Sequence, residues 1–238
     1  MFTIKKRVRT VLAAMALLGT ASTAGAANYA DATLSAMDSP RRAEFARQRA
    51  SSEVRHVADW VVESGDNGHL PFALIDKVNA RIFVFDAAGR IRGTSPVLLG
   101  LARGDDSVPG IGERKMSEIR PDERTTPAGR FVAERGRNLN GEDIFWIDYD
   151  AAVSMHRVRA NNARERRLER LATPTAGDNR ISYGCVNVPA RFYNEVIDPA
   201  FTPAAGIIYV LPEARSAREV FGARGASPTQ NRRAANVR

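Results

Sequence analysis

The fold class of this chain is decided by the stretch FALIDKVNARIFVFDAAGRIRGTSPVLL, residues 72–99. Residues 72–78 and 81–85 are short runs rich in branched aliphatic and aromatic side chains, which favour extended backbone in a packed sheet. The DAAG sequence at 86–89 predicts a turn, after which residues 91–99 return as another extended run. The stretch therefore predicts a β-meander or a pair of hairpins.

The chain after this stretch predicts more strands than helices. Further extended runs are expected at 125–133, 144–149, 153–158 and 206–211. Residues 100–124 are rich in glycine and charge, which predicts a long polar loop. Short helices are expected over 161–171 and 189–197. We therefore predict a single, mainly β domain with short inserted helices.

The regions that flank this domain differ from it in composition. Residues 27–38 are small and polar, which predicts a flexible spacer. Residues 39–71 predict an N-terminal helix and loop, because apolar residues recur every three or four positions between about 40 and 63. Residues 213–238 contain little to bury and predict a disordered tail.

The first 26 residues resemble a secretory signal peptide. Four basic residues between positions 5 and 9 precede an apolar run at 11–18, and the AGA sequence at 24–26 offers a cleavage site. The apolar run is shorter than the roughly 20 residues that span a bilayer. We therefore expect an exported protein of the periplasm or cell envelope, without stable membrane insertion after cleavage.

Charge composition limits the partners. The formal charge of +8 falls to +4 without residues 1–26, since 31 Lys and Arg then face 27 Asp and Glu. A nucleic-acid-binding face is usually denser in basic residues interleaved with aromatics, so no nucleic-acid partner is expected. The arginines between positions 164 and 170 predict either a solvated helix face or contacts with substrate carboxylates.

Cys185, in the stretch ISYGCVNVP at 181–189, is the only cysteine of the chain. A single thiol cannot form an intramolecular disulfide, so in an exported protein it is a candidate nucleophile. It could also be a small buried hydrophobic residue, or it could link two copies of the chain. The adjacent Gly184 favours the first interpretation, because glycine allows close approach of the backbone to a substrate.

A nucleophilic thiol needs a basic neighbour that lowers its pKa. Of the three histidines, His156 is the best candidate, because it ends a predicted strand and the intervening polar segment could return the chain beside it. His56 and His69 are expected to be structural. One cysteine and three scattered histidines show no metal-ligand spacing, so no metal site is predicted.

These residues together resemble a known family. The sequence SYGCVN at 182–187 is similar to the nucleophile motif of L,D-transpeptidases, the YkuD-type catalytic domain. His156 matches the histidine upstream of that motif, and TPAGRF at 126–131 is similar to the family's Thr-Pro-x-Gly-x-Phe segment. The resemblance covers residues 72–211 and implies a β-sandwich-like catalytic domain, placed here at 72–212.

The resemblance also implies a reaction and its residues. Cys185, deprotonated with help from His156, would take the acyl group of a peptidoglycan stem peptide as a thioester and pass it to an amine, without any cofactor. Backbone N–H groups at Gly184 and Cys185 would bind the oxyanion. Six positions are expected to support the loop or contact the substrate: Gly184, Ser182, Tyr183 and Asn187 in the first role, Arg157 and Thr126 in the second.

The chain departs from the family pattern at three points. Arg157 follows the histidine where glycine is common, Tyr183 stands where many members have a second histidine, and the segment between His156 and Cys185 is long. These departures leave other functions open. The thioester could pass to water, as in an L,D-carboxypeptidase or an amidase that releases wall-linked protein, or the domain could be a wall-binding module with a decayed site. The sequence leaves the oligomeric state open.

Overall fold

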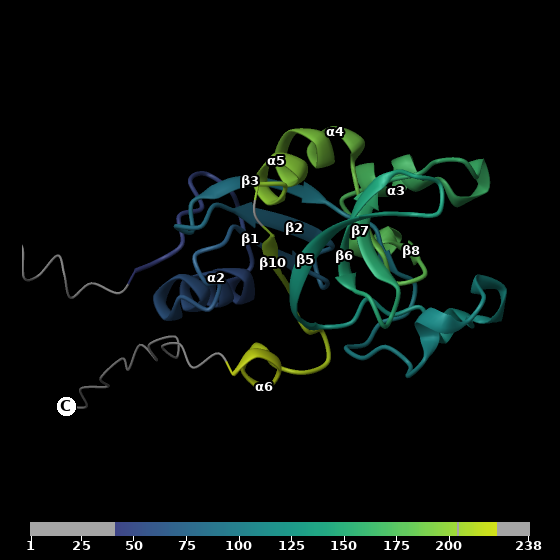
Figure 1. The fold of residues 1–238 in the computed structure, drawn as a ribbon, viewed down its shortest axis with the longest axis horizontal. Coiled ribbons are helices and arrows are strands. Elements are labelled where there is room, and N and C mark those ends of the chain that lie inside the picture. Colours follow the sequence, from purple (N-terminus) through teal and green to yellow (C-terminus); the bar gives the residue numbers. More distant parts are fainter. Residues whose placement is uncertain (1–40, 204, 223–238) are drawn as a thin grey trace, which may run out of the picture. The chain divides into compact units, whose positions relative to one another are not determined.

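The computed structural model describes residues 41–203 and 205–222, which belong to one compact unit of the chain (Figure 1). The predicted signal peptide and spacer lie outside the described residues. Ten strands are present in the described part: β1 Phe72–Asp76, β2 Arg81–Phe85, β3 Ile91–Pro96, β4 Leu99–Gly100, β5 Gly129–Arg137, β6 Asp143–Asp148, β7 Val153–Arg157, β8 Arg180–Ser182, β9 Val186–Val188 and β10 Gly206–Val210. The prediction of a mainly β domain with short inserted helices is confirmed.

Eight of these strands form one sheet in the order β3-β2-β1-β10-β5-β6-β7-β9, and β4 pairs with β8. Neighbours in the large sheet are antiparallel except β1 with β10 and β7 with β9, and β4 with β8 is also parallel. The two ends of the large sheet approach each other, because Leu98 and Asn187 exchange backbone hydrogen bonds of 2.8 and 2.9 Å. The sheet is therefore nearly closed, and its two halves face each other as in a sandwich.

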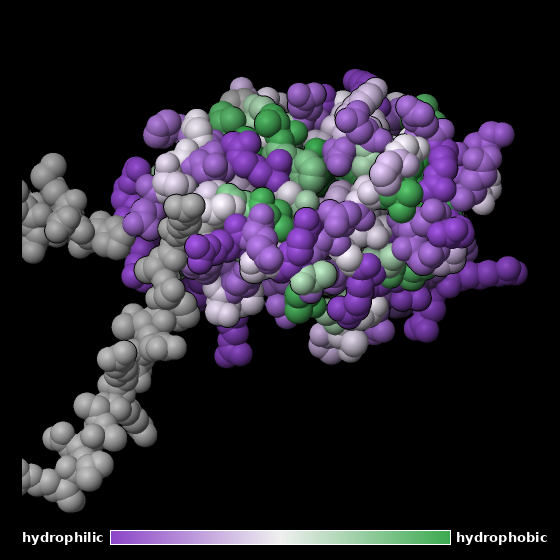
Figure 2. All heavy atoms as spheres, turned by 90° about the horizontal axis from the view of Figure 1, so that it is seen from below, coloured by the Kyte–Doolittle hydropathy of each residue, from purple (hydrophilic) through white to green (hydrophobic). Residues whose placement is uncertain are grey.

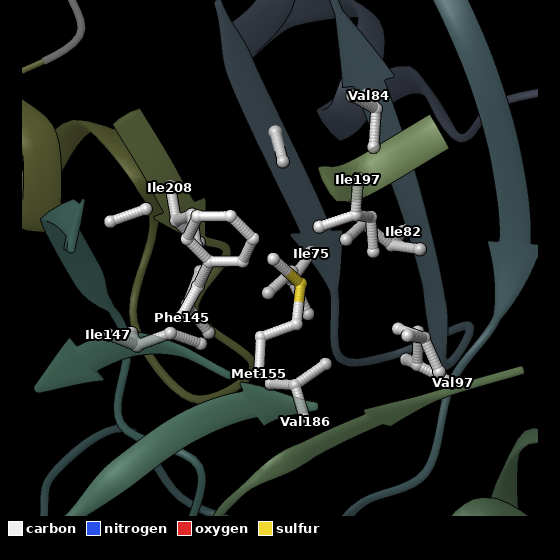
Figure 3. Packing of buried hydrophobic residues seen from close by; sticks show 14 of the residues in the cluster. Ile75, Ile82, Val84, Val97, Phe145, Ile147, Met155, Val186, Ile197 and Ile208 are labelled. Atoms are coloured by element: carbon white, nitrogen blue, oxygen red, sulfur yellow. The ribbon is translucent and has the colours of Figure 1, made fainter. Parts of the chain in front are cut away.

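The enclosed face of the sheet carries the main hydrophobic core, shown close up in Figure 3. Ile75 and Ile82 from one end of the sheet share this cluster with Phe145, Met155 and Val186 from the other end. Strands β1 and β2 are buried on both faces, since their alternate residues belong to a second cluster under helix α2. This double burial explains why the two strands read as continuous apolar runs.

Helices cover both faces of this part of the sheet (Figure 1). Helix α2, Ser52–Ser64, packs with the second cluster. Helices α4, Ala190–Phe192, and α5, Asp198–Phe201, are joined by a π-helical turn and pack on the main core. The surface seen in Figure 2 is mainly hydrophilic, with apolar residues in small separate groups, as expected of an ordinary domain surface.

The N-terminal helix is shorter than predicted. It begins after Ser51, whose hydroxyl caps the Val54 N–H at 3.3 Å, and it ends at Gly65 with a left-handed conformation. Upstream, Glu44 hydrogen-bonds in extended conformation to Gly89 and Ile91, and Phe45 packs against the sheet aromatics. Burial of Phe45 and pairing at the sheet edge therefore outweigh the helical pattern of residues 40–51.

The tail expected to be disordered from residue 213 has structure up to 222. Glu213 forms a buried ion pair with Arg180. Helix α6, Ala217–Phe221, begins with a capping box between Ser216 and Glu219, and Phe221 stacks on Trp60 of α2. The prediction was wrong for this segment because low hydrophobicity hid one buried carboxylate and one aromatic contact. Residues 223–238 lie outside the described part.

The two polar segments contain only short helical turns. The loop at 100–124 forms three 3-10 turns, at Ile111–Glu113, Met116–Glu118 and Pro121–Glu123. The helix predicted over 161–171 is divided into a 3-10 turn, Ala163–Glu165, and helix α3, Arg167–Ala172. Both segments reach the cavity described below, so they bear on the site.

Candidate active site

Cys185, the candidate nucleophile, lies in a tight turn between β8 and β9, which we call the nucleophile turn (residues 182–185). The Ser182 hydroxyl donates to the Cys185 carbonyl at 2.6 Å and accepts the Gly184 N–H at 3.1 Å, so one side chain closes the turn. Gly184 has a φ of 132°, and a Cβ there would lie 2.8 Å from the Thr125 carbonyl oxygen. Glycine is therefore required at this position, both by conformation and by space. Because Ser182 already accepts the Gly184 N–H, that group is not the free oxyanion donor the resemblance implied.

Cys185 is a partly exposed residue, and its thiol has polar neighbours. Its Sγ lies 3.6 Å from the Ser154 hydroxyl and 3.8 Å from the Ala152 carbonyl oxygen. Burial alone would raise the pKa of the thiol, but the neighbouring His156 and Ser154 together lower it. The structure thus excludes the alternative of a thiol sealed in apolar packing, and the site favours the thiolate.

His156 is held in one orientation on strand β7. Its Nδ1 lies 2.8 Å from the Arg157 carbonyl oxygen. A carbonyl oxygen only accepts hydrogen bonds, so Nδ1 carries the proton in the neutral ring and Nε2 keeps its lone pair. His156 Nε2 therefore carries the lone pair that a general base needs, in a ring that lines the same cavity as Cys185.

Asn187 connects the histidine to the nucleophile turn. It is paired with His156 across β7 and β9, and its Nδ2 lies 3.4 Å from His156 Nε2 and 3.3 Å from the Cys185 carbonyl oxygen. Its Oδ1 accepts a 2.5 Å hydrogen bond from Arg167 Nη1. Since a guanidinium only donates, Arg167 sets the orientation of the amide. Arg167 comes from the long segment between His156 and Cys185, so that segment contributes to the site.

A cavity of about 530 Å³ opens at the thiol. Its lining includes Cys185, His156, Ser154, Ala152, Ser182 and Tyr183. The β5–β6 hairpin tip, the 100–124 loop and the segment between His156 and Cys185 also line it, with Asn138, Leu139, Met116, Arg159, Asn162, Glu165 and Arg167. The two polar segments therefore shape the space in front of the thiol.

Tyr183 lies at one side of this cavity. The guanidinium of Arg124 stacks on its ring, 3.8 Å from the centroid, and also donates to the Ile119 carbonyl oxygen. Such a stacked cation contributes about 0.5–1 kcal/mol at an exposed site. Tyr183 thus joins the 100–124 loop to the nucleophile turn.

Thr126 and Arg157 were expected to contact the substrate, but neither residue lines the cavity. Thr126 is fully buried, and its hydroxyl donates to the Gly184 carbonyl at 2.8 Å while accepting the Gly100 N–H. Arg157 is paired with Asp143 at 3.2 Å and stacks on Tyr193. Thr126 therefore supports the nucleophile turn from behind, and Arg157 ties β7 to its surroundings.

A buried ionic cluster lies behind the turn. Lys77 Nζ donates to Asp105 at 2.9 Å, to the Thr126 carbonyl at 3.0 Å and to the Gly104 carbonyl at 2.5 Å. Asp105 also accepts the backbone N–H of Glu213. Arg180, which begins β8, donates to the Lys77 carbonyl at 2.9 Å and to Glu213 at 2.7 Å. The cluster therefore fixes the start of β8, which leads into the turn, and it fixes Thr126, whose hydroxyl donates to Gly184 in the turn.

Sequence reasoning missed Ser154 and this cluster. Ser154 had a local signal, because it lies two positions before His156 in a strand and so shares its face. Lys77 and Glu213 had none, since their residue types are common on surfaces and they lie far apart in the sequence. Within residues 41–203 and 205–222, no group of three His, Cys, Asp or Glu side chains is placed to hold a metal ion. No helix of that same part is long and apolar enough to cross a membrane.

Comparisons with known proteins give structural matches alone. No protein-family model matches the chain, and no curated protein does. Among solved structures, the chain is similar to residues 123–326 of the L,D-transpeptidase from Xylanimonas cellulosilytica, with 15% identity and a TM-score of 0.38 over 59% of this chain and 60% of that one. It is also similar to an Enterococcus faecium L,D-transpeptidase, with 14% identity and a TM-score of 0.35 over 59% of this chain and 49% of that one.

The catalytic domain of the E. faecium L,D-transpeptidase is a third match, with 15% identity and a TM-score of 0.33 over 59% of this chain and 96% of that domain. These structures are of the family whose motifs the sequence resembles. The chain spans 60% and 49% of the first two.

Proposed function

We propose that the protein is an exported cysteine acyltransferase that acts on peptidoglycan stem peptides by L,D-transpeptidation. The observation that carries the proposal is that a partly exposed Cys185 and His156 line one cavity, where His156 and Ser154 lower the pKa of the thiol. A thiol with these neighbours is a reactive nucleophile. The motifs at 126–131 and 182–187 supply the substrate class by resemblance.

In the first step, His156 Nε2 takes the thiol proton and the Cys185 sulfur attacks the carbonyl carbon of the third stem residue, a diaminopimelyl residue. The C–N bond to the terminal D-alanine then breaks. The imidazolium returns its proton to the leaving amine, so D-alanine departs and a thioester remains. Nδ1, which donates to the Arg157 carbonyl, keeps the ring oriented during both transfers.

The negative charge on the carbonyl oxygen needs hydrogen-bond donors. We assign this role to the Cys185 N–H, because Ser182 already accepts the Gly184 N–H. Loss of one such donor typically costs on the order of 10²–10³ in rate. In the second step, the side-chain amine of a neighbouring stem attacks the thioester and frees the thiol. No metal or organic cofactor takes part in either step.

The departures from the family pattern fit an active enzyme. The backbone carbonyl of Arg157 accepts the hydrogen bond from His156 Nδ1, and the Arg157 side chain is paired with Asp143. Tyr183 does not cover Cys185, because both residues line the cavity. The long segment between His156 and Cys185 contains Arg167, which donates a hydrogen bond to Asn187. These contacts favour an enzyme over a decayed wall-binding module.

The test is incubation of the purified protein with disaccharide-tetrapeptide muropeptides, followed by mass spectrometry of the products. Cross-linked dimers that have lost one D-alanine are the expected result. Trimmed monomers would assign the thioester to water, as in a carboxypeptidase. Unchanged substrate, with the same result for Cys185→Ala, would contradict any acyl transfer to these stems.

Location is tested separately from chemistry. We expect residues 1–26 to be removed on export to the periplasm or cell envelope, because they have the composition of a signal peptide. N-terminal sequencing of the protein from the envelope fraction should show the new terminus near residue 27. An intact N-terminus in that fraction would contradict cleavage.

A further inference from the structure

An aromatic pair lies beside the candidate active site, outside the cavity. Trp146 on β6 and Tyr149 in the following turn have ring centroids 5.0 Å apart at an interplanar angle of 63°. Tyr149 is 75% exposed and Trp146 is partly exposed. The rings form an open corner that the proposed chemistry does not use.

Strand register places Trp146 on the same face as Ser154, whose hydroxyl contacts the Cys185 thiol. Phe145 and Met155, which are paired across β6 and β7, point into the enclosed core. Because successive strand residues point to opposite faces, Trp146 and its partner Ser154 point outward. The Ser154 hydroxyl lies 3.6 Å from Cys185 Sγ. Trp146 is therefore on the strand next to Ser154, the residue whose hydroxyl contacts the Cys185 thiol.

The indole lies over strand β5, on the side away from the thiol. A Cβ on Gly136 would lie 2.5 Å from Trp146 Nε1, so only glycine leaves room for the ring there. Glu134, which is exposed, is the cross-strand partner of Trp146 and shares its face. The corner thus combines two aromatic rings with a carboxylate that can accept hydrogen bonds from hydroxyl groups.

This chemistry matches a neutral sugar. The face of a pyranose ring presents weakly positive C–H groups, which complement the negative face of an aromatic ring. Its equatorial hydroxyls can donate to a carboxylate such as Glu134. An anionic ligand would be repelled by that carboxylate, so an uncharged N-acetylhexosamine fits better.

The distance also matches the substrate. Strands lie about 4.8 Å apart, so the outer edge of the indole over β5 is about 10 Å from β7. Three residues of extended peptide span about 10 Å. In the proposed reaction, three stem residues separate the glycan from the reacting carbonyl.

Resting on the proposed function, we propose that Trp146, Tyr149 and Glu134 form a glycan-binding subsite for the N-acetylhexosamine chain that carries the stem peptide. Stacking on this subsite places the third stem residue at Cys185. The enzyme then selects stems that are attached to glycan over free peptides.

Binding can be tested without any turnover. The chain has two tryptophans, so Trp60→Phe leaves Trp146 as the only source of tryptophan fluorescence. Titration with N,N′,N″,N‴-tetraacetylchitotetraose should change its fluorescence saturably, and Tyr149→Ala should weaken the apparent affinity about two- to tenfold. Trp146→Phe, titrated in parallel, should lose the response. A flat titration at millimolar sugar would overturn the subsite while leaving acyl transfer intact.

Kinetics provide a second test. The ratio of kcat/KM for disaccharide-tetrapeptide over free tetrapeptide should exceed one in the native protein and fall toward one in Trp146→Ala. Leu168→Ala, which changes an apolar residue of α3 that is 56% exposed, is the matched control and should keep the native ratio. Equal losses on both substrates would assign Trp146 a structural role and overturn the proposal. So would self-association through this surface, seen as a dimer that Trp146→Ala dissociates in sedimentation.

Discussion

Two polar clusters lie near the nucleophile turn, a buried one around Lys77 and a second one at the cavity, and they differ in how fully their ionisable groups are paired. In the buried cluster, all three donors of Lys77 are used within 3.0 Å. At the cavity, the Cys185 sulfur has only long contacts of 3.6 and 3.8 Å to Ser154 and Ala152. The buried cluster holds the backbone around the turn in place, because each of its charged groups has close partners. The cavity cluster keeps the Cys185 sulfur available for reaction, because this atom has no close partner among the described residues.

The pKa shifts follow the same division. Burial lowers the pKa of Lys77 against the opposing effects of Asp105 and Glu213, and the cluster has no access to the cavity. At Cys185, burial opposes the thiolate but His156 outweighs it. The comparison suggests that stability depends on one cluster and reactivity on the other, which single substitutions can test.

The largest effect is expected from Cys185→Ala. Removing the proposed nucleophile should lower product formation by a factor on the order of 10⁴ or more, and it should change the free energy of unfolding by less than about 1 kcal/mol. Muropeptide analysis and urea unfolding measure the two quantities. Residual activity near that of the native protein would show that another group carries the acyl chain.

His156→Gln should reduce turnover by about 10²–10⁴ and raise the pKa of the thiol. With the histidine, the pKa of the thiol is lowered from its ordinary value. Without it, burial is no longer outweighed, so the pH midpoint of iodoacetamide alkylation should move above that value. His69→Gln is the control and should keep the native midpoint. An unchanged midpoint in His156→Gln would remove the histidine from the site.

Lys77→Met should act on stability first. Breaking a buried ion pair by removing one partner costs about 3–5 kcal/mol, because the remaining charge stays buried. Arg191→Ala, which breaks a pair whose arginine side chain is 85% exposed, should cost less than about 1 kcal/mol. Urea unfolding compares the two. Equal losses would mean that the buried cluster is not what stabilises the turn.

Thr126→Val tests the link between the clusters. The change keeps the shape but leaves the Gly100 N–H and the Gly184 carbonyl without the Thr126 hydroxyl. Each unsatisfied buried group costs about 1–3 kcal/mol, and we expect kcat to fall while KM changes little. Thr125→Val, the same change one position earlier, is the control. A rise in KM without a change in kcat would instead indicate that Thr126 contributes to substrate binding.

The smallest effect is expected from acid. The hydrogen bonds from Lys77 and from the backbone of 213–215 outweigh burial and hold the pKa of Asp105 below its usual range. In the unfolded chain, the Asp105 carboxylate binds a proton near pH 4. The stability that this carboxylate contributes is therefore present above that pH, and it is lost as the pH falls toward the pKa of Asp105 in the folded protein. Urea midpoints between about pH 5 and pH 2 should decline, and Asp105→Asn should flatten the decline. An equal slope in that variant would assign the acid sensitivity elsewhere.

Much of the fold was readable from local patterns. Residues 81–85 form a strand with the predicted bounds, and the other predicted strands lie within a few residues of the observed ones. The helix at 40–51 was predicted wrongly, because the apolar spacing there also serves an edge pairing that places Phe45 on the sheet. Ordered structure at 213–222 was missed because it depends on one carboxylate that is matched across the chain.

The sequence by itself determined the mainly β class and the candidate pair Cys185 and His156, because residue type and strand periodicity are local properties. The tertiary structure decided what each remaining group does. Thr126 was expected at the substrate and lies behind the turn, while Arg167 was one of several arginines and contacts Asn187. Near closure of the sheet brings together residues that are distant in the chain, and which side chains meet depends on register and packing, which no local pattern contains.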